Sequence, residues 1–452
     1  MTRSYLLFAC LCSLSFSLHA QTPELTAWIY NTTGLTGSHY EVGTYTPFSD
    51  DALANVQEVE YSDDNVYVHS TGVPAYPTGP FQDGNPSYAS ELEYLFRIPR
   101  DPEPNTGTLT EPGLGHIGVW INGVPVYNYS DAMSYNGMDI WHRNAVVFEN
   151  AGFDCSKGHP APIMGAPGPD IPGMYHHHQN PSPFSAATAP LSDVCESYPA
   201  DGLYIPDAGQ HSPLLGYAFD GYPIYGAYAY GNADGSGGIT RMESGWAKRD
   251  ITQRHTLADG TVLDMAEWGP DINDSYPLGA YKEDFEFTGG GDLDVHNGRF
   301  AVTPEYPEGT YAYYTTIDED GNSAFPYVIG ETYYGIVAAD NFPMGPVLTS
   351  VVISEPTNVY DPSTAVVLLE LPEIMLFPNP ATDQVQLQVL GVLHTDQEVL
   401  ATDLLGNSTL LKVWPAGTTR LAMDVSGLAA GYYQLTIGNN QQQTHRSLMI
   451  IR

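Results

Sequence analysis

The chain has 452 residues, 42% of them hydrophobic, and its 53 Asp and Glu against 15 Lys and Arg give a formal net charge of -38. This charge excludes nucleic acid and anionic membranes as partners and suits a salty extracellular medium. The length predicts two or more compact units, and 45 Gly, 36 Pro and 32 Tyr favour strands with tight turns, so we expect a mainly β protein.

The first twenty residues, MTRSYLLFACLCSLSFSLHA, have the layout of a cleavable secretory signal. One Arg precedes an apolar run, and Ala20 precedes a polar start at Gln21. The apolar run before Cys10 is too short for a lipoprotein signal. No later apolar run reaches about 18 residues, so no membrane span is predicted.

Removal of the signal at residues 1–20 leaves two cysteines, Cys155 and Cys195, in an exported chain. Cysteines in an oxidising compartment usually pair, so we expect a disulfide between them. The loop that this bond closes contains the run PGMYHHHQNP, residues 172–181.

Two hairpins are predicted in the first third of the chain. The first lies in NVQEVEYSDDNVYVHSTG, which starts at Asn55, and the second in HIGVWINGVPVYNYSD, which turns at Asn122 and Gly123. We expect one large, irregular β-rich body domain over residues 21–371, with its core at about residues 66–335.

If the histidine run lies on a strand, its side chains alternate between the two faces, and residues i and i+2 share a face about 6 to 7 Å apart. His176 and His178 then lie on one face, and Tyr175 and His177 point the other way. Two imidazoles at this spacing can bind one copper, zinc or iron ion. Alternatively, these histidines donate hydrogen bonds to carbonyl groups or stack on tyrosines.

A metal site needs more than two histidines, and His159 in CSKGHP is the favoured third ligand because the predicted disulfide holds its segment. Asp220 in AFDGYPIYG is a ligand, a general base or a turn cap. The additional metal candidates are His142, His211, His296 and Tyr175.

Three later segments have weaker signals. Residues 251–268 form the stretch most compatible with a helix, and Tyr311 and Tyr313 share a strand face that either stacks on sugar rings or packs in the core. In DEDGN, the residues Asp318, Asp320 and Asn322 offer oxygen ligands for calcium, although a polar hairpin turn explains them equally well.

The body resembles the YHYH domain family, named for a Tyr-His-Tyr-His run. Tyr175, His176 and His178 match the first, second and fourth signature positions, and His177 stands where the second Tyr is expected. The resemblance implies an exported protein but no activity. It rests on INGVPVYN (121–128), WHRNA (141–145), DCSKGHP (154–160), MYHHHQNP (174–181), LLGYAFDGYPIYGAY (214–228), LDVHNGRFAVTPEYPEGTYAYYTT (293–316) and FPYVIG (325–330).

The last 81 residues, 372–452, differ from the body, because they hold only 6 of the 53 acidic residues. Short alternating runs separated by Gly, Asn and Asp predict a small antiparallel β-sandwich. The cues LFPNPATDQVQLQV, TDLLGN and DVSGLAAGYYQLTI, with a basic last residue, resemble the C-terminal sorting domain of the type IX secretion system of Bacteroidetes. The resemblance implies transport across the outer membrane by that machinery, then tail removal and release or surface attachment.

Two hypotheses about function follow. The first is an exported protein that binds a transition metal through the His-x-His pair, with hydrolytic or oxidative chemistry if it is an enzyme. The alternative is a non-catalytic extracellular module that binds glycans or an unknown small molecule, or adheres to particles, with or without calcium. We find no Gly-x-Ser-x-Gly, phosphate-loop or His-Glu-x-x-His motif.

Overall fold

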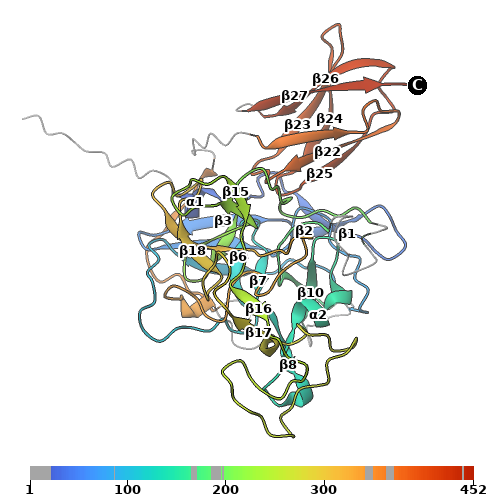
Figure 1. Ribbon diagram of the computed structural model, residues 1–452. Helices are drawn as coiled ribbons and strands as arrows, with labels where there is room; N and C mark the ends of the chain where they lie inside the picture. The colour runs from blue at the N-terminus through green and yellow to red at the C-terminus, as the bar shows by residue number, and fades with distance from the viewer. Residues whose placement is uncertain are drawn as a thin grey trace, which may run out of the picture.

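The computed structural model describes residues 22–85, 87–163, 171–184, 195, 198–341, 350–362, 371–439 and 442–452. Strands dominate the structure and the helices are single turns, so the predicted mainly β class is confirmed (Figure 1). Residues 1–20, the predicted signal peptide, lie outside the described residues. Within the described ranges, no helix has the length and apolar character to cross a membrane.

A mixed eight-stranded sheet runs through the body (Figure 1). Its strands are antiparallel except for the pairs β11 with β7 and β13 with β19, which are parallel. Strands β10 and β11 form one edge of this sheet, and that edge carries the histidine run. The order is β10 (Gly158–Pro162), β11 (Gly173–His177), β7 (Pro125–Tyr127), β6 (His116–Trp120), β12 (Leu214–Ala218), β13 (Pro223–Tyr225), β19 (Thr310–Tyr314) and β18 (Gly298–Ala301).

A four-stranded antiparallel sheet shares the core of the body. Val68 and Phe96 from this sheet and Val119 and Tyr313 from the large sheet belong to the same buried cluster, and each is at most 1% exposed. Both predicted hairpins are present, since β3 pairs with β4 and β6 pairs with β7. The sheet order is β20 (Asn358–Val359), β3 (Val56–Tyr61), β4 (Asn65–Ser70) and β5 (Tyr94–Pro99).

Short elements cover the ends of the two sheets. The two-stranded pairs are β1 (Thr36–His39) with β2 (Phe48–Leu53), β8 (Ser130–Ser134) with β9 (His142–Asn144), β14 (Tyr228–Tyr230) with β15 (Ile239–Arg241), and β16 (Trp246–Lys248) with β17 (Phe285–Phe287). The helical turns are α1 (Pro23–Thr26), α2 (Ala145–Phe148), η1 (Tyr135–Gly137), η2 (Asn150–Gly152), η4 (Lys282–Asp284) and η5 (Ala339–Asn341).

Residues 251–268 form turns and one isolated bridge, not the helix that their sequence favours. A turn at Asp259 and Gly260, where Gly260 has a φ of 86°, interrupts the segment, and the side chain of Arg254 is fully buried. It binds both carboxylate oxygens of Asp284 at 2.7 Å and donates to the carbonyl groups of Pro270, Tyr276 and Pro277. These tertiary contacts override a weak local preference.

The tail forms two antiparallel sheets with their own buried core, as a small sandwich requires. It stands at one end of the body in Figure 1, in orange and red. Val392 and Ala416 from that end of the tail belong to the buried cluster of the body, and Asp201 accepts a hydrogen bond from the amide of Thr419 at 3.0 Å. The sheets are β21 (Glu373–Phe377), β22 (Gln384–Leu390) and β25 (Arg420–Asp424), and β24 (Ser408–Trp414), β23 (Gln397–Thr402), β26 (Gly431–Gly438) and β27 (Gln443–Ile450).

Candidate metal centre

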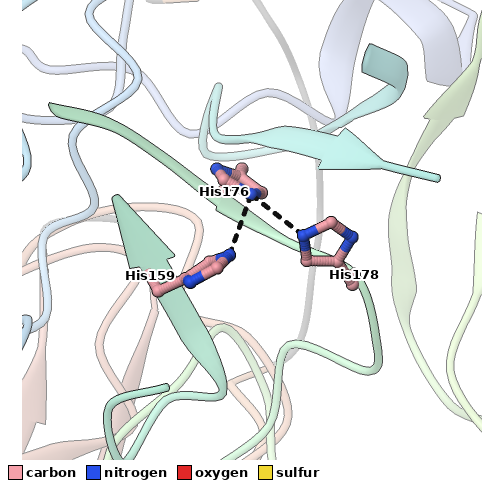
Figure 2. Close-up of side chains that lie close together, drawn as sticks. All are labelled: His159, His176 and His178. Carbon is pink, nitrogen blue, oxygen red and sulfur yellow. Dashed lines mark hydrogen bonds between the residues drawn. The ribbon is translucent and has the colours of Figure 1, made fainter. Parts of the chain in front are cut away.

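Three histidine side chains converge at the edge of the large sheet (Figure 2). His159 on β10 and His176 on β11 are register partners in the antiparallel pair, and His178 directly follows β11. The Nε2 atom of His176 lies 3.1 Å from Nε2 of His159 and 3.1 Å from Nε2 of His178. All three residues are buried. The alternation predicted for His176 and His178 is therefore present.

The turn before β10 holds His159 in place. Asp154 is fully buried, and its Oδ1 accepts hydrogen bonds from the amides of Ser156 and Gly158, while its Oδ2 accepts one from the hydroxyl of Tyr175. Gly158 is required here because a Cβ at this position would lie 2.3 Å from the Tyr175 hydroxyl oxygen. The missing side chain lets β10 pair closely with β11, which aligns His159 with His176.

Backbone carbonyl groups determine the tautomers of two imidazoles. Nδ1 of His176 lies 2.7 Å from the carbonyl oxygen of Met174, and Nδ1 of His178 lies 2.5 Å from that of Asn128. A carbonyl oxygen only accepts, so each Nδ1 carries the proton, and Nε2 of the neutral ring keeps a free lone pair. In metal sites, the ring nitrogen that does not bind the metal typically donates such a hydrogen bond, and this contact orients the histidine ligand.

Burial favours the neutral forms of His159 and His176. It lowers the pKa of His159 to about 3, with a smaller contribution from the neighbouring His178, and it lowers the pKa of His176 well below its ordinary value. Neutral imidazole is the form that binds metal ions.

Glu149 also reaches this group, although no motif in the sequence points to it. Its Oε2 lies 3.1 Å from Nε2 of His178 and 3.3 Å from Nε2 of His159. Burial raises the pKa of Glu149, and the positive charge of the neighbouring Arg143 opposes this effect. Glu149 directly follows the short helix α2 (Ala145–Phe148), and no spacing rule connects it to the histidine run.

The spacing of these nitrogen atoms fits a metal ion. Two nitrogens that each lie 2.0 to 2.1 Å from a tetrahedral zinc ion are about 3.3 to 3.4 Å apart. The observed separations from His176 are both 3.1 Å, and in the His176–His178 contact the lone pairs of the two Nε2 atoms face each other. Such a contact between two acceptors is unfavourable unless a cation lies between them.

A cavity of about 390 Å³ lies beside the three histidines. The histidines form part of its wall, together with Glu149, Tyr127 and Asp131. The ring of Tyr127 stacks on that of His176 with their centres 3.7 Å apart. A small molecule in this cavity is therefore in reach of the convergent nitrogen atoms.

Tyr175 and His177 point to the opposite side of β11, as predicted. The hydroxyl of Tyr175 donates to Asp154 at 2.9 Å, and Nε2 of His177 lies 3.1 Å from the carbonyl oxygen of Ser156. Both side chains are buried. The position at which this chain departs from the Tyr-His-Tyr-His pattern therefore faces the packed core.

The other proposed ligands are not members of this group. Asp220 caps its turn and accepts hydrogen bonds from the Tyr313 hydroxyl and the Gly335 amide, at 2.5 and 2.9 Å. The three other histidines have partners outside the group. His142 contacts Glu283 and Asp139, His211 contacts the carbonyl of Ser212, and His296 contacts Thr332.

Two further acidic clusters lie at the surface. In the DEDGN turn, Asp318 accepts hydrogen bonds from the amides of Asp320 and Asn322 and from the Asn322 side chain. These contacts are those of a polar hairpin turn, which is the alternative to calcium binding at this segment. On β3 and β4, His69 lies 3.0 Å from Glu60, and Glu58 lies close to both on the exposed face.

The predicted disulfide is present, since Cys155 and Cys195 are bonded with their Cα atoms 5.3 Å apart. Cys155 lies in the turn that precedes β10, three residues before its first residue. The bond therefore attaches Cys195 next to the turn that positions His159.

Comparison with known families identifies two regions. Residues 95–325 match the model described as YHYH protein, and residues 375–451 match the secretion system C-terminal sorting domain. Comparison with curated proteins and with solved structures gave no match. Since the first match spans 231 of the 452 residues and includes the three histidines, this chain belongs to the YHYH protein family, and its sorting domain directs export across the outer membrane to the cell surface or the medium.

Proposed function

We propose that this secreted YHYH protein binds a transition metal ion through Nε2 of His159, His176 and His178. The observation that carries the proposal is the convergence of three Nε2 atoms, with separations of 3.1 Å from His176, of which those of His176 and His178 are on imidazoles whose Nδ1 atoms donate to carbonyl groups. In that tautomer Nε2 has a free lone pair that can bind a metal ion, and a bound cation removes the repulsion between the lone pairs.

The site also supports reactivity, because it borders a cavity and is not enclosed on all sides. A bound zinc, iron or copper ion supplies Lewis acidity, and iron or copper also supplies electron transfer. The chain's own contribution is to hold three neutral imidazoles and to keep their exposure low. We propose hydrolysis and oxidation as the two classes of reaction that such a site would support.

Elemental analysis tests the proposal. The mature chain is produced without a histidine tag, purified without metal affinity resin and measured by mass spectrometry for zinc, iron and copper. We expect about one transition metal ion per chain, and its loss in the double variant His176→Ala, His178→Ala. The loss is expected because a single remaining imidazole is too weak a ligand set.

A matched control is His177→Gln, which changes the same tract on its opposite face. Gln still donates to the Ser156 carbonyl oxygen, so this variant is expected to keep the metal. Near-UV circular dichroism checks that all proteins are folded. A native protein without metal, or a double variant with the native metal content, would contradict the proposal.

Glycan binding is a second candidate function, favoured by a separate cleft of about 690 Å³. Trp246, Phe285 and Phe325 line it together with Arg241 and Asp318, which combines apolar ring faces with charged groups. This reading predicts that binding to a glycan array is unchanged in the double histidine variant and is lost in Trp246→Ala. If the native protein binds no glycan on the array, this second candidate function is wrong.

A further inference from the structure

The carboxylate of Glu149 has an unusual environment. Its Oε2 atom is buried, yet it has no hydrogen-bond partner of acceptable geometry. Its near neighbours are instead Nε2 of His178 at 3.1 Å and Nε2 of His159 at 3.3 Å. A buried carboxylate oxygen without a partner is costly, so this contact needs a physical explanation.

The tautomers exclude simple hydrogen bonding as the explanation. The proton of neutral His178 is on Nδ1, where it is donated to the carbonyl oxygen of Asn128, so Nε2 and the carboxylate oxygen are two acceptors that face each other. An extra proton on His178 would satisfy this one contact. That single hydrogen could not also be donated in full to Nε2 of His176, a second acceptor 3.1 Å from Nε2 of His178.

A single metal ion satisfies all of these contacts together. Three nitrogen atoms and one oxygen atom are connected by separations of 3.1, 3.1, 3.1 and 3.3 Å. The corresponding edge of a tetrahedral site with ligands at 2.0 to 2.1 Å is about 3.3 to 3.4 Å. Oε2 of Glu149 therefore has nearly the spacing of a first coordination shell from two of the three histidine nitrogens.

We infer that Glu149 is the fourth ligand and that the centre has three imidazoles and one carboxylate. This inference rests on the proposed function. The donor set is made of nitrogen and a hard oxygen, which suits a divalent ion such as zinc or iron(II) and disfavours copper(I), an ion that prefers sulfur ligands. It therefore narrows the metals that the histidines alone would accept.

Glu149 is also the ligand nearest to the solvent. Its side chain is 30% exposed, whereas those of His159 and His178 are 9% and 5% exposed. The cavity beside it is lined by the carboxylates of Asp83 and Asp131, and none of its described lining residues is Lys or Arg. Because Asp131 is paired with Arg143, the exposed Asp83 is the carboxylate of this wall that favours the approach of a cation. The exposure of Glu149 places it where a molecule from the cavity would first meet the metal.

The test uses the full mature chain, stripped of metal and titrated with Zn²⁺ or Co²⁺. We compare wild type with Glu149→Gln, and the matched control is Asp83→Asn, which removes one negative charge from the same cavity. Loss of an outer-shell partner costs roughly 10- to 100-fold in metal affinity, so loss of a ligand in Glu149→Gln is expected to cost at least that much. Asp83→Asn is expected to stay within about threefold of wild type, because an exposed charge acts only through screened attraction.

Absorption of the Co²⁺ protein provides a readout of the donor set. We expect the d–d bands of Glu149→Gln to differ in position or intensity from those of wild type and of Asp83→Asn. Urea unfolding of the metal-free proteins checks that the variants are folded.

The outcomes separate the two proposals. If wild type binds neither ion, the proposed function fails. If wild type binds one ion while Glu149→Gln has the same affinity and the same Co²⁺ spectrum, the histidine centre stands and Glu149 is not a ligand. If Asp83→Asn weakens binding as much as Glu149→Gln does, the effect is one of charge alone and the inference is overturned.

Discussion

His142 lies between two carboxylates at the surface. Nδ1 is 2.6 Å from Glu283 and Nε2 is 2.9 Å from Asp139, and the hydrogen bond to Glu283 is the largest of the effects that raise the pKa of His142 to about 9. The folded protein thus binds this proton more tightly than the unfolded chain does. The resulting stabilisation is complete below about pH 6.5 and is lost as the pH rises through about 9.

We therefore predict that His142→Gln is destabilised relative to wild type at pH 6 and that this difference shrinks by pH 9.5. Urea unfolding midpoints of both proteins at the two pH values measure it. The effect is modest because the side chain is one-third exposed and solvent screens the ion pair. A difference that stays constant across this range would refute the assignment of the charge to His142.

Arg254 and Asp284 form an ion pair in which both side chains have 0% exposure. Asp284→Asn leaves a buried guanidinium without its counter-charge, and breaking such a pair typically costs about 3 to 5 kcal/mol. We expect a loss of this size in the free energy of unfolding, measured with urea at pH 7.5. The exposed Asp264→Asn in the same region serves as control and is expected to change it by about 0.5 kcal/mol or less.

At the scale of elements, the pairing of β10 with β11 depends on Gly158. In Gly158→Ala the new methyl group would lie 2.3 Å from the Tyr175 hydroxyl oxygen and 3.0 Å from Nε2 of His177, so the strands must separate. We predict a loss of about 1 to 3 kcal/mol in stability and a weaker affinity for the metal, since His159 moves with β10.

Gly290→Ala is the control for this prediction, because the nearest atom to its new methyl group is 3.5 Å away. Both variants are compared by urea unfolding and by Zn²⁺ titration. An unchanged affinity in Gly158→Ala, with normal stability, would show that the strand pair is not what aligns His159 and His176.

Local pattern was a good guide to the strands and a poor guide to residues 251–268. The hairpins β3–β4 and β6–β7 follow from alternation and from the turn at Asn122 and Gly123, which are properties of neighbouring residues. The segment 251–268 depends instead on the bond from Arg254 to Asp284, thirty residues away. A contact of that length leaves no periodic signal in the sequence.

At the scale of the whole molecule, charge is the dominant feature. Residues 21–371 carry 47 of the 53 acidic residues and 10 of the 15 basic ones, so the body repels itself at neutral pH. Repulsion between exposed charges acts over about 30 Å at 0.01 M salt but only over about 10 Å at 0.1 M. We predict that the urea unfolding midpoint at pH 7.5 rises when NaCl is increased from 10 mM to 300 mM.

The control for the salt prediction is the same pair of measurements near pH 4.3, the isoelectric point of the sequence. The net charge is close to zero there, so the salt effect is expected to disappear. An equal effect at both pH values would point to a general salt effect on solvation and not to charge repulsion.

The sequence by itself determined the β class, the two hairpins, the sharing of one face by His176 and His178, the sorting tail and the family. Each of these depends on residues that are close in the chain or on a motif read in order. Only the tertiary structure decided that His159 faces His176 across a strand pair and that Glu149 lies beside His159 and His178. It also decided that the group does not include Asp220, His142, His211 or His296. The physical reason is that a metal site is assembled from side chains on different segments, and their distances are set by strand register and loop packing, which no spacing along one chain records.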